Sequence, residues 1–157
     1  MRRLAAALTG AVVALAAMAH ASDAPPLARA AAREGVELDR ATAVVEALTE
    51  AGAGEWTPLL LAVAIRESSL RYRVETCEVL GDNGAAVGLW QTHARGLRRE
   101  LLCRGGMRAQ AREAVRHLLR VCGGSPEERV ACYAGRKPDH WIVRDRLALA
   151  GRLTAEK

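Results

Sequence analysis

The clearest shortage in this 157-residue sequence is of aromatic residues. Phenylalanine is absent, and three tryptophans and two tyrosines bring the aromatic share to only 3%. Strands favour aromatic and β-branched side chains, whereas the alanine, leucine and arginine that recur here favour helices. We therefore expect an all-α fold that contains at most a minimal β segment.

Long apolar runs and a strong charge imbalance are also missing. Half of the residues are hydrophobic and 26% are charged. A membrane-spanning helix needs about 20 consecutive apolar residues, and a disordered chain combines low hydrophobicity with high net charge. The composition therefore excludes both classes for most of the chain, and the length predicts a single compact domain.

The N-terminal segment has the pattern of a targeting sequence. Two arginines precede an uncharged stretch of small and apolar residues at 4–17, and Ala19-His20-Ala21 supplies the small-x-small pattern that signal peptidases recognise. A membrane anchor or a buried helix is the alternative, but the stretch is short for a span and lacks a stop-transfer flank. We predict a signal peptide over 1–21 and a mature domain over 22–157, which places the protein in the periplasm or outside the cell.

The charge of the mature part is modestly positive. The whole chain carries +5, and loss of the two arginines with the leader lowers this by two, to +3. An exported basic protein meets anionic envelope polymers before it meets nucleic acid. Because no basic run with interleaved aromatics is present, we expect no nucleic-acid partner, and no membrane contact after cleavage.

Four cysteines, an even number, lie in the predicted mature part. In an exported chain this number indicates two disulfides, for which three pairings are possible. Structural zinc sites usually use closely spaced Cys-x-x-Cys pairs, whereas the spacing here is wide and irregular. We predict disulfides between sequence neighbours, because these close the shortest loops: Cys77 with Cys103, and Cys122 with Cys132.

Proline, glycine and capping residues divide the mature part into helices. Thr57 before Pro58 and Asp39 before an apolar stripe are expected caps, and Ser125 with Glu128 forms a capping-box pattern. Turn residues at 81–84 predict a loop, followed by a short extended segment. The expected helices span approximately residues 26–33, 40–51, 58–68, 97–102, 109–122, 126–134 and 138–153, and the expected extended segment spans 87–92.

Glu67 is the sharpest local feature of the sequence. It follows the segment 59–65, which is apolar on every helical face and is therefore expected at the centre of the domain. Dehydration at such a helix end, together with the negative end of the helix dipole, raises a carboxyl pKa toward the range of a general acid. The alternative is a solvated or salt-bridged glutamate, with neighbouring Arg66 offsetting part of the shift.

Four short motifs in a fixed order resemble the goose-type-lysozyme-like lytic transglycosylases. They are Glu67-Ser68, the loop Gly-Asp-Asn-Gly at 81–84, Gly-Leu-Trp-Gln at 88–91 and Ala-Cys-Tyr-Ala-Gly at 131–135. The family has Glu-Ser at a buried helix end, a Gly-Leu-Met-Gln-like strand and an Ala-x-Tyr-Asn-x-Gly-like helix. This chain has tryptophan in place of the methionine and lacks the asparagine. The resemblance implies a lysozyme-like domain over 22–157.

The resemblance also implies roles for individual residues. Glu67 corresponds to the catalytic acid, Ser68 to the serine beside it and Gln91 to a glutamine that contacts glycan, and Ser68, Gln91, Trp90 and Tyr133 would together bind the substrate. Tyr133 corresponds to the tyrosine that faces the acid and would hold its carboxyl through the phenol hydroxyl, and Trp90 would provide a face for sugar stacking. Without the resemblance, Trp90, Trp141 and Tyr133 would be interpreted as core residues and Gln91 as an amide that braces a loop.

A second catalytic carboxylate is not evident. Glu75, Glu78 and Asp82 are candidates, with Asp82 better explained as a turn former, and the resemblance implies assistance by the substrate N-acetyl group instead. His93 has no second ligand at metal-like spacing, so no metal or other cofactor is expected. The spacing also fails to nominate a base for Ser68 or Ser69 as a nucleophile.

These features predict an enzyme that cleaves the β-1,4 bond between N-acetylmuramic acid and N-acetylglucosamine in peptidoglycan strands. Glu67 would act first as acid and then as base, either in hydrolysis or in formation of an anhydro-sugar end. The protein would act as a monomer. The alternatives are a non-catalytic envelope or glycan-binding protein on the same fold and a structural helical bundle without a ligand.

Overall fold

Helices make up most of the computed structural model, which describes residues 23–155. Within this range the single sheet is an antiparallel pair, β1 (Ala86–Val87) with β2 (Thr92–His93). This confirms the prediction of an all-α domain with a minimal β segment. The predicted leader at 1–21 lies outside the described residues, and no described helix is long and apolar enough to cross a membrane.

The elements follow one another with short connections. Besides the α-helices, the described residues form three short helical turns. The turns η1 (Gly54–Trp56) and η2 (Asp82–Gly84) are 3₁₀ turns, and η3 (His117–Val121) is a π-helical turn. The α-helices of the described residues are α2 (Pro26–Arg33), α3 (Leu38–Glu50), α4 (Thr57–Ser68), α5 (Tyr72–Glu75), α6 (Gly96–Arg104), α7 (Gly106–Arg116), α8 (Pro126–Ala134) and α9 (Trp141–Thr154).

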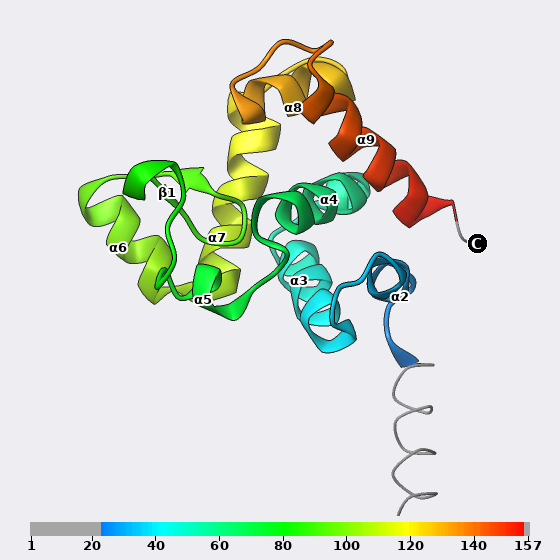
Figure 1. Cartoon of the computed structure of the whole chain (residues 1–157), viewed down its shortest axis with the longest axis horizontal. Helices are drawn as coiled ribbons and strands as arrows, with labels where there is room; N and C mark the ends of the chain where they lie inside the picture. Colours follow the sequence, from blue (N-terminus) through cyan, green and yellow to red (C-terminus); the bar gives the residue numbers. More distant parts are fainter. Residues whose placement is uncertain (1–22, 156–157) are drawn as a thin grey trace, which may run out of the picture.

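Helix α4 lies at the centre of the domain, between α3 and α9 (Figure 1). Every residue from Leu59 to Ile65 is buried, as expected for a helix that is apolar on all faces. The neighbouring helices therefore enclose its middle, while its C-terminal end, with exposed Arg66 and half-buried Glu67, reaches the surface. This arrangement determines where Glu67 lies.

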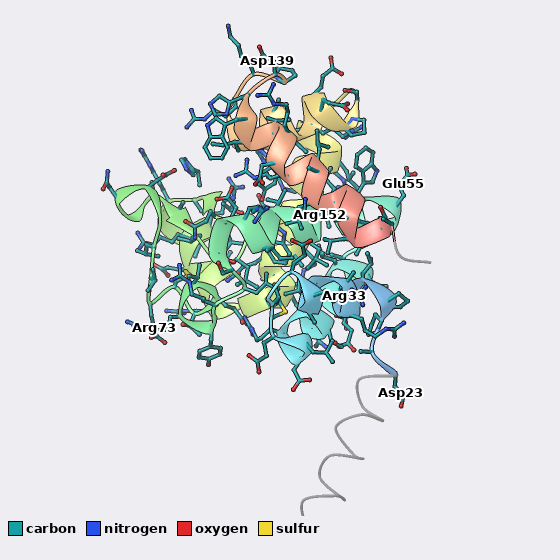
Figure 2. All side chains as sticks on the ribbon, turned by 45° about the vertical axis from the view of Figure 1, so that its right-hand side comes forward. Asp23, Arg33, Glu55, Arg73, Asp139 and Arg152 are labelled. Atoms are coloured by element: carbon teal, nitrogen blue, oxygen red, sulfur yellow. A yellow bond between two sulfur atoms is a disulfide. The ribbon has the colours of Figure 1, made fainter. Side chains whose placement is uncertain are left out.

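The first and last helices enclose the same core. Helix α2 packs against α3 and α9, and α8 packs against α9 and η3. Arg152 of α9 donates through Nε and Nη2 to the two carboxylate oxygens of Glu34, at 2.7 and 3.0 Å, just after α2 ends. Figure 2 labels Arg152 on the helix, and it labels Asp139 in the loop that leads from α8 into α9.

A small lobe beside the bundle contains α5, α6 and the β1–β2 hairpin (Figure 1). Its own core consists of Val87, Ala94 and Leu102, with Leu80 packed against it. Residues 88–91 form a tight turn in which the Gln91 N–H donates to the Gly88 carbonyl at 3.0 Å. The prediction of one extended segment over 87–92 is therefore wrong, because Gly88, at φ +73°, reverses the chain between two short strands.

The predicted helix caps are partly confirmed. Ser125 and Glu128 form the capping box, with hydrogen bonds in both directions. Asp39 and Thr57 lie inside their helices and are not caps, and the Thr57 hydroxyl instead donates to the Gly54 carbonyl at 2.7 Å. The last helix begins at Trp141 rather than 138, where the preceding histidine accepts a hydrogen bond from Ile142.

Both disulfides have the predicted pairing. Cys77–Cys103 joins the segment after α5 to α6, and Cys122–Cys132 joins the end of η3 to α8. They close loops with sequence separations of 26 and 10. The first links two elements of the lobe, and the second links two elements of the bundle.

A buried glutamine of α7 fixes the hairpin turn to the bundle. The Gln110 side-chain oxygen accepts from the Leu89 N–H at 2.9 Å, and its amide nitrogen donates to the carbonyls of Glu75 and Leu102. A Cβ at Gly88 would lie 2.4 Å from the Gln110 amide carbon. Only glycine therefore lets the turn approach α7 closely enough for these bonds.

We expect Gln110→Met to lower the free energy of unfolding by about 2 kcal/mol, because it leaves the buried Leu89 N–H without an acceptor. Equilibrium urea unfolding followed by circular dichroism measures this. Gln91→Met, which changes a half-buried amide in the same turn, is the matched control and should cost less. Equal losses for the two variants would contradict the bracing role of Gln110.

Replacing the cysteines pairwise by serine should destabilise the fold through the larger entropy of the unfolded chain. We expect a loss of about 3.5 kcal/mol for Cys77 and Cys103 and about 2.7 kcal/mol for Cys122 and Cys132, because the first pair closes the longer loop. The same unfolding measurement checks both values. A larger loss for the second pair would contradict the loop-entropy explanation.

Candidate functional site

Glu67 lies in the last turn of α4, where the chain changes direction sharply. The two residues that follow the helix, Ser69 and Leu70, have positive φ angles of 51° and 53°, so the helix ends at Ser68. The Ser68 hydroxyl donates to the Ala64 carbonyl at 2.8 Å and accepts from the Leu70 N–H at 3.2 Å. These bonds fix the helix end and thereby the position of Glu67.

The Glu67 side chain borders a polar cavity of about 210 Å³ at the junction of bundle and lobe. It retains 24% exposure, so the carboxyl is largely dehydrated but still reachable. The walls come from the end of α4, η2, the hairpin turn, α8, the following loop and α9. The lining residues are Glu67, Asp82, Trp90, Gln91, His93, Tyr133, Ala134, Arg136, Ile142 and Arg146.

A second cavity of about 240 Å³ extends this space. It shares Gln91, His93, Tyr133 and Ala134 with the first, so the two cavities adjoin and together form one groove. We call this the Glu67 groove.

The direct partner of Glu67 is Arg146 of α9, whose Nη2 donates to the carboxylate Oε1. No sequence motif pointed to this residue, which is 79 positions away from Glu67. Arg146 follows Val143 by three residues and precedes Leu149 by three, so it occupies the buried stripe of its helix. An arginine in an apolar stripe is the sequence signal that would have indicated a buried carboxylate partner.

Burial raises the pKa of the Glu67 carboxyl above the usual range of a glutamate. The Arg146 guanidinium opposes this increase, through both its charge and its hydrogen bond, but does not cancel it. Asp82 adds to the increase through its negative charge. Glu67 is therefore a carboxyl that takes up a proton more readily than an exposed glutamate.

Tyr133 lies in the Glu67 groove but does not hold the acid as the resemblance implied. Its phenol hydroxyl donates to the Trp90 carbonyl at 3.3 Å, and its ring meets that of His117 edge to face at a centroid distance of 5.2 Å. Burial raises the pKa of the phenol, so it remains a hydrogen-bond donor. Tyr133 fixes the hairpin turn against α8, and Arg146 takes the position beside the carboxyl.

Two further expected substrate contacts are structural instead. Trp90 is 1% exposed and its indole N–H donates to the Leu60 carbonyl at 2.9 Å, so its ring faces are covered by the core. Ser68 is buried and both of its hydrogen bonds close α4. Trp141, by contrast, is 63% exposed, and in the sequence it directly precedes the groove residue Ile142.

Gln91 remains a groove residue, as expected. Its amide nitrogen donates to the Gly88 carbonyl at 3.0 Å, and its backbone is held at φ +46°. A Cβ at Gly81 would lie 1.8 Å from the Gln91 side-chain oxygen, so the glycine at 81 leaves the space that this side chain occupies. The second amide N–H of Gln91 is free of this bond and can serve a ligand.

The three candidates for a second catalytic carboxylate differ in whether they line the Glu67 groove. Asp82 lies in the Glu67 groove and pairs with His93, with 2.5 Å between the carboxylate Oδ2 and Nε2. Glu75 pairs with Arg40 of α3 at 2.7 Å, and Glu78 pairs with Arg73 at 3.3 Å, and neither lines the groove. Asp82 is therefore the carboxylate that shares the cavity with Glu67.

One cluster among residues 23–155 has the residue types of a metal site. The ligand atoms of His117, Cys122 and Cys132 lie within 4.8 Å of one another. The two sulfurs are bonded to each other, however, and metals bind thiolates. We assign no metal to this cluster.

No model of a known protein family matches this chain, and no curated protein or solved structure matches it either.

We expect Arg146→Met to raise the pKa of Glu67 further, because the variant removes the positive charge and hydrogen bond that oppose the effect of burial. A ¹³C NMR titration of the glutamate carboxyls, with Glu67→Gln used to assign the signal, measures the change. Arg66→Met is the matched control, because Arg66 pairs with Asp145 and should leave the Glu67 titration unchanged. A lower pKa in Arg146→Met would contradict the assignment.

Proposed function

We propose that this protein cleaves the glycan strands of peptidoglycan at the β-1,4 bond between N-acetylmuramic acid and N-acetylglucosamine. The observation that carries the proposal is the position of Glu67, a partly dehydrated carboxyl with a raised pKa that borders a polar cavity, which a second cavity adjoins. Protonation of a glycosidic oxygen requires an acid of this kind. The order of the four motifs supports the same function.

In this proposal Glu67 acts twice. It first donates its proton to the leaving glycosidic oxygen, as the substrate acetamido group stabilises the sugar carbon. The resulting carboxylate then accepts a proton from water, which gives hydrolysis, or from a hydroxyl of the same sugar, which gives an anhydro end. A second carboxylate is not required for this route, and Asp82 is committed to His93.

The other groove residues position the strand. Gln91 offers its remaining amide N–H to sugar hydroxyl or acetamido groups, beside the cavity that Glu67 borders. We assign the aromatic sugar contact to the exposed Trp141, which precedes the groove residue Ile142 in α9, in place of the buried Trp90. Tyr133 and Gln110 hold the turn that carries Gln91.

An envelope location is part of the proposal. The domain has few aromatic residues and is closed by two disulfides. Disulfides persist in an oxidising compartment. The net positive charge suits an anionic wall polymer. We propose a periplasmic or secreted monomer that acts on the wall without a cofactor.

A non-catalytic glycan-binding protein is the second candidate function. The observation that favours it is the ion pair between Glu67 and Arg146, because a guanidinium stabilises the ionised carboxylate that cannot donate a proton. A binding protein would retain wall fragments in the groove and release none.

Glu67→Gln should abolish clearing of wall material in a zymogram, because an amide cannot donate the proton. The purified wild-type protein should clear the gel, and chromatography with mass spectrometry of the products distinguishes reducing ends from anhydro ends. Glu78→Gln is the matched control: its carboxyl is exposed and lies outside the groove, so its activity should equal that of the wild type.

Clearing by Glu67→Gln at the wild-type rate would contradict the role of Glu67. Wall binding by the wild type without any released product would favour the non-catalytic function instead.

A further inference from the structure

Arg146 is a buried arginine that uses only part of its hydrogen-bonding capacity. Its side chain is 9% exposed, and its Nη2 donates to Glu67. The Nε and Nη1 atoms are buried without a hydrogen-bond partner among the described residues. Because unpaired buried donors of a charged group are costly, their presence beside a cavity indicates that an acceptor is missing.

The surroundings of Arg146 favour a negatively charged acceptor. Arg136 lines the same cavity, is exposed and makes no ion pair within residues 23–155. Asp82, the second carboxylate of this cavity, pairs with His93 rather than with Arg136. Once Glu67 is protonated, the two arginines of this cavity exceed its one ionised carboxylate, Asp82, by one positive charge.

A carboxylate matches these groups better than a neutral sugar hydroxyl does. A guanidinium presents two parallel N–H groups that fit the two oxygens of a carboxylate. In peptidoglycan strands, the N-acetylmuramic acid residue carries a lactyl ether. Its carboxyl is an amide when the peptide stem is attached and a free carboxylate when the stem has been removed.

We propose that Arg146 and Arg136 form a carboxylate subsite beside the reacting bond, which takes the free lactyl carboxylate of a peptide-free strand in competition with Glu67. This inference rests on the proposed function and specifies its substrate. When the substrate carboxylate binds Arg146, Glu67 loses its ionic partner in a dehydrated position. It then takes a proton from solvent and becomes the acid that cleavage needs.

The competition predicts an unusual binding result for the inactive Glu67→Gln variant. A neutral glutamine holds Arg146 less strongly than a carboxylate does, so the guanidinium becomes available to the ligand. Glu67→Gln should therefore bind peptide-free strands with free lactyl carboxylates about tenfold more tightly than the same strands after methyl esterification. Isothermal titration calorimetry with both strand preparations measures the ratio.

Two double variants show whether the preference depends on Arg146. Arg146→Met added to Glu67→Gln should remove the preference for the free carboxylate. Arg98→Met added to Glu67→Gln is the matched control, because Arg98 lies in the adjoining cavity and pairs with Glu113. It removes the same charge from the groove and should leave the preference intact. Arg146→Lys should retain part of the preference, and it replaces Arg146→Met if thermal melting shows that Arg146→Met is unfolded.

Equal binding of the acid and ester strands by Glu67→Gln would overturn the subsite. An equal loss of preference on removal of Arg98 would also overturn it, because the effect would then be general electrostatic attraction. A failure of the proposed function is distinguishable: the wild type would release no product from either strand, while the carboxylate preference of Glu67→Gln would persist and support the subsite.

Discussion

The burial of α4 on every side is the constraint on which the rest of the structure depends. Its apolar residues from Leu59 to Ile65 must be enclosed, and α3 and α9 provide the enclosure. Glu67 follows within the same helix and is therefore brought to the point where the core ends and the groove begins. Dehydration of the carboxyl is a consequence of this position, and Arg146 compensates for part of it.

The sequence predicted those features that depend on neighbours along the chain. The capping box at Ser125 and Glu128, the glycine-rich turn at 81–84 and the apolar central helix all arise from contacts within a few residues. The disulfide pairing followed from short loops. Glu67 and Gln91 were placed at one groove because the order of their motifs implied it, and both do line it.

The features that the sequence did not reveal depend on contacts between distant segments. Arg146 is one arginine among many, and only its position in an apolar stripe of α9 distinguishes it. From the sequence, Tyr133 could have contacted either the Glu67 carboxyl or the hairpin turn. Because α8 packs close to the turn, the Tyr133 hydroxyl donates to the Trp90 carbonyl. Trp90 is buried because Leu60 of α4 supplies an acceptor for its indole N–H. None of these choices is visible in local spacing.

The lobe side of the groove is held by covalent and polar links rather than by a large apolar core. Its outer wall consists of two-residue strands and a three-residue helical turn, which bury little surface of their own. Cys77–Cys103 closes this lobe, Gln110 ties its turn to α7, and Cys122–Cys132 secures α8, which carries Tyr133. A domain without phenylalanine thus keeps Gln91 and Asp82 fixed relative to Glu67. In such a fixed groove, we propose that an acceptor from outside binds the donors of Arg146 that have no partner among residues 23–155.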